Sequence, residues 1–323
     1  MPIRAMGGPA ELRRALAVWI TLAGAGAAVF VLSLGVGSVG LSMAQVWHAL
    51  AGGLADGGLA LAGAVMQVLL RNPLAEPYVL GVSGGAATGA LLAMLASTWP
   101  LWTVQAGAAG GALASMVLVA TLARRDLLHP QVQGGHHEAG SRLLLTGVIL
   151  AAGWGAIITL ILSIAPEARL RGMLFWLTGD LGGTADYGVA LGTLFVAIAV
   201  AMPMARALNA MLLGETVAQA LGVRVGRVRL AAFVLASLSI AAAITTAGSI
   251  GFIGLVVPHL VRLAWGNDQR LLLPASALAG GALLMAADLI ARTVIAPAQL
   301  PVGVITALLG VPTFLFLLLG RPR

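Results

Sequence analysis

The sequence predicts an all-α, polytopic membrane protein with about ten transmembrane helices in a single domain over residues 1–323. Hydrophobic residues make up 60% of the chain and charged residues only 9%, whereas soluble domains carry roughly a quarter charged residues. The mean hydropathy is +1.01, and runs of roughly 20 apolar residues, long enough to span a bilayer as a helix, recur along nearly the whole chain. A β-barrel would show shorter strands of alternating polarity. A helical bundle in a lipid bilayer is therefore expected.

Ten apolar segments follow one another along the chain, and each predicts a helix. They cover residues 15–39, 58–70, 79–98, 101–123, 143–165, 187–205, 228–247, 249–265, 273–295 and 302–319. The first is too long for the core of a signal peptide and lacks a convincing cleavage site, so it predicts the first span. The second ends at Arg71-Asn72-Pro73 and the third follows Pro77. Because proline at both ends cannot continue a helix, the chain is expected to reverse between them.

The second segment is expected to be too short for a span. Roughly 13 apolar residues at about 1.5 Å each cannot cross a hydrocarbon core about 30 Å thick. The polar and glycine-rich stretch Gly52–Gly58 runs almost directly into it. Either the chain omits residues of the natural protein or the outer half of this helix is missing. We favour omission, because a half-span would expose unsatisfied backbone to lipid.

The arginines predict the orientation of the chain. All 18 basic residues are arginine, and with both termini in the cytoplasm only Arg169, Arg171 and Arg292 fall outside, as the positive-inside rule demands. The net charge of +7 then reports orientation in a bacterial inner membrane, and nucleic-acid binding is not supported.

Two missing residue types exclude classes of chemistry. The chain has no cysteine, which excludes disulfides, haem-thiolate ligation and iron–sulfur clusters. It also has no lysine, and a phosphate-binding loop requires one. We therefore expect no ATPase activity in this chain, and the energy for any pumping must come from another subunit.

Three motifs indicate a family. They are LALAGAVMQVLLRNPLAEPYVLG at Leu59–Gly81, GFIGLVVPHLVR at Gly251–Arg262 and LPVGVITALLGVP at Leu300–Pro312. Together, and in this order, they resemble the permease subunit of the type II ABC importers that take up cobalamin, haem and ferric siderophores, the FecCD or BtuC-like permeases. The resemblance implies a homodimer with two cytoplasmic ATPase subunits, which use the ATP, and one periplasmic binding protein. It implies alternating access with no stably bound cofactor, and the motif wording favours haem as cargo, ahead of a ferric siderophore and then cobalamin.

The segment Leu213–Arg229 predicts one short helix lying at the membrane surface. It opens with Gly214-Glu215 and ends at Gly222, as a capped helix does. A solvated basic loop is the alternative. The resemblance implies that this helix docks into the ATPase, with small alanines that permit close packing and Glu215 meeting a basic residue of the partner. The residues assigned to coupling are Glu215, Thr216, Ala218, Gln219, Ala220, Leu221 and Gly222.

The resemblance also places a cytoplasmic gate and an outer docking residue. The gate residues are Asn72, Leu74 and Ser141, although an asparagine before proline also commonly caps a turn. Arg292 matches the arginine that meets an acidic residue of the binding protein. It lies four residues after Asp288, so the two share a helix face and a local ion pair is the alternative role. Arg169 and Arg171 are weaker candidates.

No metal site is expected. His129, His136 and His137 lie in a polar loop, where a solvated loop is favoured over a metal site, and His259 is expected to be structural. The alternative function is an ion-coupled secondary transporter, which would carry ionisable residues near the midplane. The acids here are expected at span ends or in loops, with Asp288 the nearest exception. A membrane-embedded scaffold is a third possibility.

Overall fold

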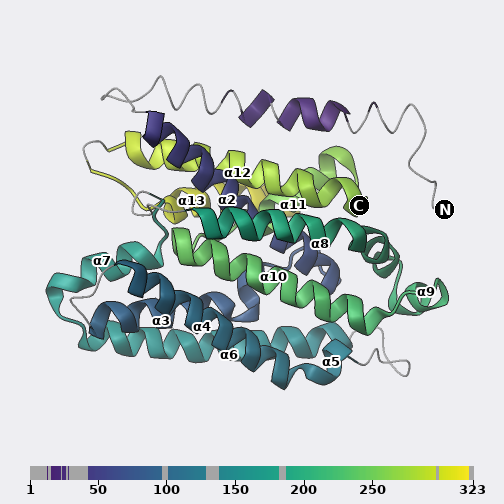
Figure 1. Ribbon diagram of the computed structural model, residues 1–323, viewed down its shortest axis with the longest axis horizontal. Helices are drawn as coiled ribbons and strands as arrows, with labels where there is room; N and C mark the ends of the chain where they lie inside the picture. Colours follow the sequence, from purple (N-terminus) through teal and green to yellow (C-terminus); the bar gives the residue numbers. More distant parts are fainter. Residues whose placement is uncertain are drawn as a thin grey trace.

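The computed structural model describes residues 13, 16–22, 24–26, 28, 43–96, 101–128, 138–181, 187–295 and 298–319. Over these ranges every regular element is a helix and no strand occurs, which confirms the all-α prediction. The long helices run along the longest axis of the molecule (Figure 1). Most of the first predicted span, residues 15–39, and the histidines 129, 136 and 137 lie outside the described residues.

Most of the described helices follow predicted segments. In chain order they are α2 (Met43–Leu69), the 3-10 helix η1 (Pro77–Leu80), α3 (Val82–Ala96), α4 (Leu101–Leu122), α5 (Arg124–Leu128), α6 (Glu138–Ile164), α7 (Glu167–Leu177), α8 (Gly188–Leu212), α9 (Glu215–Ala220), α10 (Val225–Ala247), α11 (Ile253–Trp265), α12 (Gln269–Thr293) and α13 (Val302–Leu319). The helix α2 begins well before residue 58, and α5 and α7 match none of the ten predicted segments. Six of the helices are long and apolar enough to cross a membrane, and shorter apolar helices accompany them.

The expected short second span is wrong. The helix α2 has 27 residues, about 40 Å at 1.5 Å per residue, and it includes the whole stretch Gly52–Gly58. The glycines in this stretch are contact points rather than helix ends. A Cβ on Gly57 would overlap the carbonyl oxygen of Ala277, and one on Gly53 would overlap Met285, both on α12. Small residues let helix backbones approach closely in lipid, so α2 continues through the stretch.

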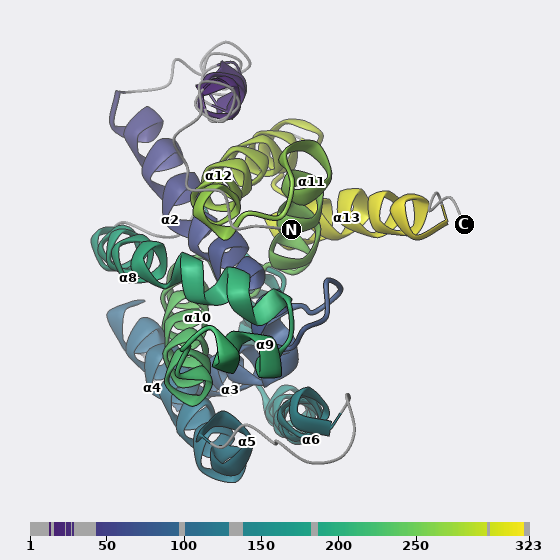
Figure 2. The same cartoon turned by 90° about the vertical axis from the view of Figure 1, so that its right-hand side faces the viewer.

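The helix α2 is the central element of the bundle. It packs against α8, α10, α11 and α12, and almost every residue from Gly52 to Leu69 is buried. Figure 2 shows α2 between α11, α12 and α13 on one side and α8 and α10 on the other. A second group, α3, α4 and α6, packs alongside α10.

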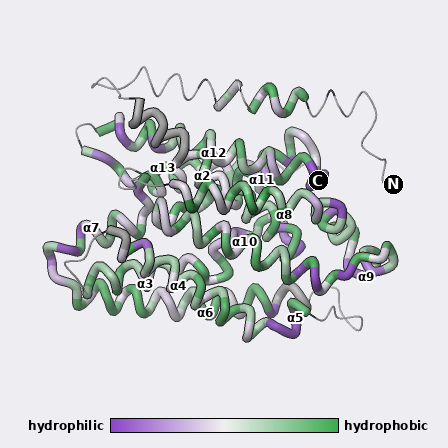
Figure 3. Tube along the Cα trace, in the orientation of Figure 1, coloured by the Kyte–Doolittle hydropathy of each residue, from purple (hydrophilic) through white to green (hydrophobic). Residues whose placement is uncertain are grey.

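The two ends of the bundle are more polar than its middle (Figure 3). Hydrophobic residues predominate along the long helices, and hydrophilic residues gather near the ends (Figure 3). The helices α5 and α9 lie at one end and α7 lies at the other (Figure 1). We refer to these as the α9 end and the α7 end. The arginines of the α9 end belong to the set that the positive-inside rule assigns to the cytoplasm.

Two segments interrupt the helices within the bundle. The helix α11 has 13 residues, about 20 Å, which is less than the thickness of the hydrocarbon core. The connection from α10 to α11, residues 248–252, contacts the turn from α2 to α3, residues 70–81. Irregular backbone inside a bundle needs protein partners for its polar groups. The bonds that supply them define the candidate site.

Candidate functional site

The turn from α2 to α3, residues 70–81, carries two of the three predicted gate residues. The side-chain oxygen of Asn72 accepts a hydrogen bond from the backbone N–H of Leu74 at 2.9 Å, and the Asn72 carbonyl accepts one from Ala75 N–H at 3.0 Å. Asn72 therefore caps the turn, the alternative role that the sequence suggested. The Leu74 side chain is exposed. Arg71, just before them, has a left-handed φ of 49°, which turns the chain away from α2.

The third gate residue, Ser141, lies in the first turn of α6. The turn packs against α6 farther along that helix, since a Cβ on Gly147 would overlap the carbonyl oxygen of Val79. Gly147 is less than two helical turns from Ser141. The turn therefore contacts α6 at Gly147, and a contact of Ser141 with Asn72 or Leu74 stays a prediction.

Two side chains hold the turn to the connection between α10 and α11. Glu76 Oε1 accepts a hydrogen bond from the backbone N–H of Phe252 at 3.0 Å. The Tyr78 hydroxyl donates to the Ile250 carbonyl at 2.8 Å and accepts from the Ile250 N–H at 2.9 Å. Phe252 has a φ of 69°, an uncommon left-handed conformation for a bulky residue. These bonds satisfy irregular backbone within the bundle and fix the turn against α11.

A second polar contact ties α2 to α11. The Arg262 guanidinium donates to Gln67 Oε1 at 2.8 Å and to Asn267 Oδ1 at 2.9 Å. The Gln67 amide in turn donates to the carbonyls of Gly254 and Leu255 at 3.4 and 3.3 Å. Sequence analysis missed this role, although Gln67 and Arg262 are conspicuous polar residues in two of the apolar motifs. Their separation along the chain gave no indication that they meet.

The helix α9 confirms the predicted short helix, but its faces differ from the expectation. Glu215 forms an ion pair with Arg229 of the same chain at 3.2 Å, so its basic partner is internal. Ala218 is fully buried and packs inside this chain rather than presenting a surface. The exposed apolar side chains are Leu213, Val217 and Leu221. Val217 and Leu221 are four residues apart and share one face of α9, whereas Leu213 caps the end of α8 and is separated from α9 by Gly214, whose φ is 112°.

The helix α9 begins beside the turn that carries the gate residues. A Cβ on Gly214, the residue before α9, would lie 3.9 Å from the Arg71 guanidinium. Arg71 immediately precedes Asn72, so the start of α9 and the gate turn are adjacent. This proximity could not be predicted from the sequence, because it depends on how α8 returns to the end of α2.

The rim at the α7 end shows the predicted ion pair. Arg292 Nε lies 2.9 Å from Asp288 Oδ2; the Arg292 side chain is 45% exposed and the Asp288 side chain 8%. Arg169 has a structural role instead, since its guanidinium donates to the carbonyls of Met94 and Leu95 at 3.0 and 2.7 Å and so caps α3. A half-exposed arginine remains available to a partner, which distinguishes Arg292 from Arg169.

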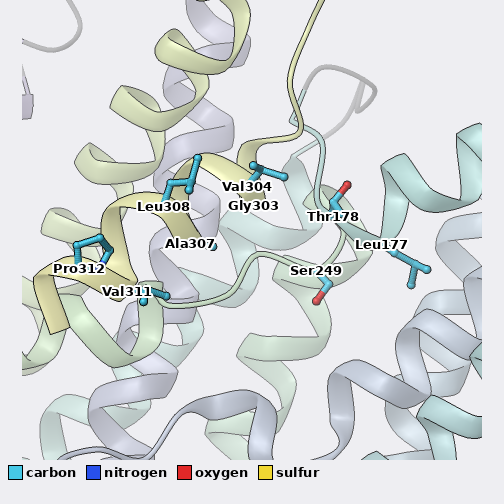
Figure 4. Close-up of a pocket in the computed structure, with 9 residues that line it drawn as sticks. All are labelled: Leu177, Thr178, Ser249, Gly303, Val304, Ala307, Leu308, Val311 and Pro312. Carbon is cyan, nitrogen blue, oxygen red and sulfur yellow. The ribbon is translucent and has the colours of Figure 1, made fainter. Parts of the chain in front are cut away.

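A cavity of about 560 Å³ lies along α13 (Figure 4). Its lining combines aliphatic side chains with two hydroxyl residues: Leu177, Thr178, Ser249, Gly303, Val304, Ala307, Leu308, Val311 and Pro312. The residues come from the end of α7, the connection between α10 and α11, and α13. The cavity therefore adjoins the irregular segment that Glu76 and Tyr78 hold. None of the lining residues is ionisable.

The expectation that the acids avoid the spans is wrong for Asp56. Asp56 lies in the middle of α2 and is fully buried. The Thr246 hydroxyl donates to its Oδ1 at 3.4 Å, while Oδ2 has no hydrogen-bond partner among the described residues. Sequence analysis missed Asp56 because the surrounding glycines suggested a loop.

The described residues contain no cluster of three or more histidine, cysteine or carboxylate side chains suited to a metal. His259 is buried in α11 directly after Pro258, in keeping with a structural residue.

Comparisons with known proteins find close relatives. The model of the FecCD transport family matches residues 25–320. The chain is 42% identical over 265 residues to the cobalamin import system permease protein BtuC of Halobacterium salinarum, covering 81% of this chain and 69% of that protein. It is 41% identical over 275 residues to the hemin transport system permease protein HmuU of Yersinia pestis, covering 81% of this chain and 78% of that protein.

A solved structure shares the fold. An inward-facing conformation of a putative metal-chelate type ABC transporter superposes with a TM-score of 0.82 at 27% identity, covering 95% of this chain and all of that one. The match extends over the whole bundle rather than over the motifs alone.

Proposed function

Because the chain belongs to the FecCD transport family, we propose that it imports haem across a bacterial inner membrane as one half of a homodimeric channel. Membership makes the chain a multi-pass membrane permease subunit of an ABC importer rather than an enzyme, with ATP hydrolysis performed by a separate ATPase. An ion-coupled secondary transporter and a passive scaffold are thereby set aside.

The cavity along α13 supports an apolar cargo. Its wall is aliphatic apart from Thr178 and Ser249, and Thr178 Oγ1 is already bonded to the carbonyls of Leu174 and Phe175. Such a wall offers weak, non-directional contact, which suits a large planar porphyrin that has to leave again. Axial ligands would retain it. A relative named as a hemin permease at 41% identity agrees with this choice, with a ferric siderophore and cobalamin as the alternatives.

The α9 end supports docking of the two ATPase subunits. Leu213, Val217 and Leu221 expose 60%, 44% and 53% of their surface, and we assign all three to the docking contact. Of these only Leu221 belongs to the predicted coupling residues, and the predicted Ala218 is buried. The segment also carries the exposed arginines Arg224 and Arg227. The proximity of Arg71 to Gly214 would let movement at α9 reach the gate turn, which contains Asn72 and Leu74. A periplasmic binding protein would dock at Arg292.

Uptake into proteoliposomes tests the cargo. The permease is reconstituted with its ATPase and binding protein, and uptake of haemin, cyanocobalamin and a ferric hydroxamate is compared with ATP inside. We expect ATP-dependent accumulation of haemin above the other two. An ATPase variant unable to hydrolyse ATP is the control and should abolish it. Preferential accumulation of cyanocobalamin or the hydroxamate would contradict haem as cargo while leaving the importer assignment intact.

A further inference from the structure

The helix α9 is joined to its neighbours by two glycines with unusual backbone. Gly214 has a φ of 112° and Gly222 a φ of 81°, values that side chains other than glycine rarely adopt. Between them lie only six helical residues. A helix this short has little stability of its own, and neither flanking glycine carries a side chain that could pack and fix its direction. Its orientation therefore depends on contacts with the rest of the chain.

One polar contact links α9 to α10. Glu215, the first residue of α9, pairs with Arg229 Nη1 at 3.2 Å, and the Arg229 side chain is only 1% exposed. Arg229 lies in the second turn of α10. Its Nε has no hydrogen-bond partner within the described part of the chain, so Glu215 supplies the counter-charge for a buried guanidinium. Removing one partner of such a pair leaves an uncompensated buried charge.

The choice of partner is specific. Glu215 is the only acidic residue between Leu213 and Arg229, and Arg224 and Arg227 are both nearer to it along the chain. Both are exposed, whereas the arginine that pairs with Glu215 is buried. The contact therefore anchors α9 to the body of the protein rather than to its own surface loop. On the same side Ala218 is fully buried.

We propose that the buried ion pair between Glu215 and Arg229 is a positioning joint that fixes the orientation of α9 against α10. With the joint closed, Ala218 faces inward and Leu213, Val217 and Leu221 face outward. Movement of α9 is then transmitted to α10 through one charged contact. The identity of the docking partner rests on the proposed function, but the joint itself is a property of this chain alone.

Spin labelling of the permease alone tests the joint. The chain has no native cysteine, so Val217→Cys accepts a single nitroxide on the exposed face of α9. In lipid nanodiscs we expect Glu215→Gln to shorten the rotational correlation time of this label several-fold, because α9 then pivots about its two glycines. The charge swap Glu215→Arg with Arg229→Glu should restore the slower motion.

Two controls separate loosening of α9 from general disorder. Glu167→Gln makes the same chemical change at the first residue of another short helix, α7, and should leave the label unchanged. A nitroxide at Leu308→Cys on α13, 66% exposed in the native chain, should not respond to Glu215→Gln. If Glu215→Gln fails to fold, the double variant Glu215→Arg with Arg229→Glu decides. Slow label motion in the folded double variant supports the joint, and fast label motion contradicts it.

The outcomes distinguish the joint from the docking assignment. The joint is overturned if Glu215→Gln leaves the motion of the label unchanged. It is also overturned if the label stays mobile in the charge-swap variant. If the label is mobilised and co-purification with the ATPase falls, both assignments stand. If the label is mobilised while ATPase assembly and transport-coupled hydrolysis remain at the wild-type level, the joint stands and the docking assignment is wrong.

Discussion

The Arg292 side chain is bonded to Asp288 and is otherwise partly exposed to solvent. Its Nε donates to Asp288 Oδ1 at 3.0 Å, while the Arg292 side chain is 45% exposed. The rest of the group can therefore meet a carboxylate of an incoming protein. A charge on the rim affects the rate and orientation of association more than it affects final affinity.

Arg292→Glu should slow association with the periplasmic binding protein. The change replaces attraction by repulsion, so the effect should be largest at low ionic strength, where charges are least screened. Association rates measured at several salt concentrations check this. Arg171→Glu is the comparison variant, because Arg171 is exposed, belongs to the same predicted outer side and, as the weaker candidate, should slow association less. Wild-type, salt-independent rates in Arg292→Glu would leave the arginine with only its bond to Asp288.

The sequence predicted contacts between residues only where local geometry determines them. Asp288 and Arg292 are four apart on a helix, so their pairing follows from 3.6 residues per turn. The partner of Glu215 could not be predicted, because the path of the chain between α9 and α10 decides whether Arg224, Arg227 or Arg229 comes within reach. Asp56 was missed for a related reason, since its environment is supplied by α10 rather than by its neighbours along the chain.

The contact between α2 and α11 depends on the absence of side chains. A Cβ on Gly63 would overlap the backbone of Gly254. The same segment is bonded through Gln67 and Arg262, so it cannot move apart without breaking polar contacts. Helices that approach this closely gain van der Waals contact, which drives helix association in lipid.

Gly63→Ala should therefore destabilise the protein by about 1–3 kcal/mol, the usual cost of overpacking a filled interior. Thermal unfolding in detergent should show a lower apparent Tm. Gly110→Ala on α4 serves as control, because a Cβ there meets nothing within 4 Å, and its effect should stay within about 0.5 kcal/mol. Equal melting temperatures for Gly63→Ala and the wild type would contradict this prediction, because they would mean that α11 moves to accommodate the methyl group without loss of stability.

Helices were predicted correctly where hydropathy alone indicates them. The prediction failed for α2, because glycine occurs both at helix ends and at close contacts between helices. Apart from α5, α7 and α9, the helices from α3 to α13 follow the predicted apolar runs, whereas α5 and α7 match none of them because they are short and carry charged residues. In α2, glycine suggested a helix end, as it does in water. The structure instead uses Gly53 and Gly57 to bring α12 close. Which meaning applies depends on the neighbouring helix, which a single sequence does not reveal.

At the scale of the whole molecule, the proposed gate requires two copies of the chain. Asn72 and Leu74 lie on a turn that Glu76 and Tyr78 hold rigidly, so the turn should move with α10 and α11 as a unit. Closure then brings the turns of the two subunits together rather than bending either one.

Cysteine at position 72, 74 or 141 should crosslink across the dimer when the inner side is closed. A disulfide requires Cα atoms within about 7 Å, and the native chain has no cysteine, so every crosslink is unambiguous. We expect at least one of Asn72→Cys, Leu74→Cys and Ser141→Cys to crosslink, leaving some ATP hydrolysis but no cargo release. Val189→Cys, on the highly exposed start of α8, controls for random collision.

Two results would place the gate elsewhere. One is the absence of a crosslink at all three positions in every nucleotide state. The other is full transport by a crosslinked complex, because a covalently closed gate cannot pass a large cargo. Ser141 is the most informative of the three, since its place beside the turn stays a prediction.

The central position of α2 creates a problem of timing during synthesis. Four of the helices that bury it, α8, α10, α11 and α12, are translated after α7, and α12 begins only at Gln269. Of the six long helices, the α2 segment has the lowest hydropathy, at 1.3, and it carries the Asp56 carboxylate. Hydrocarbon offers that group no hydrogen bond. Until the C-terminal half emerges from the ribosome, water or the insertion machinery has to shelter the helix on which the finished bundle is built.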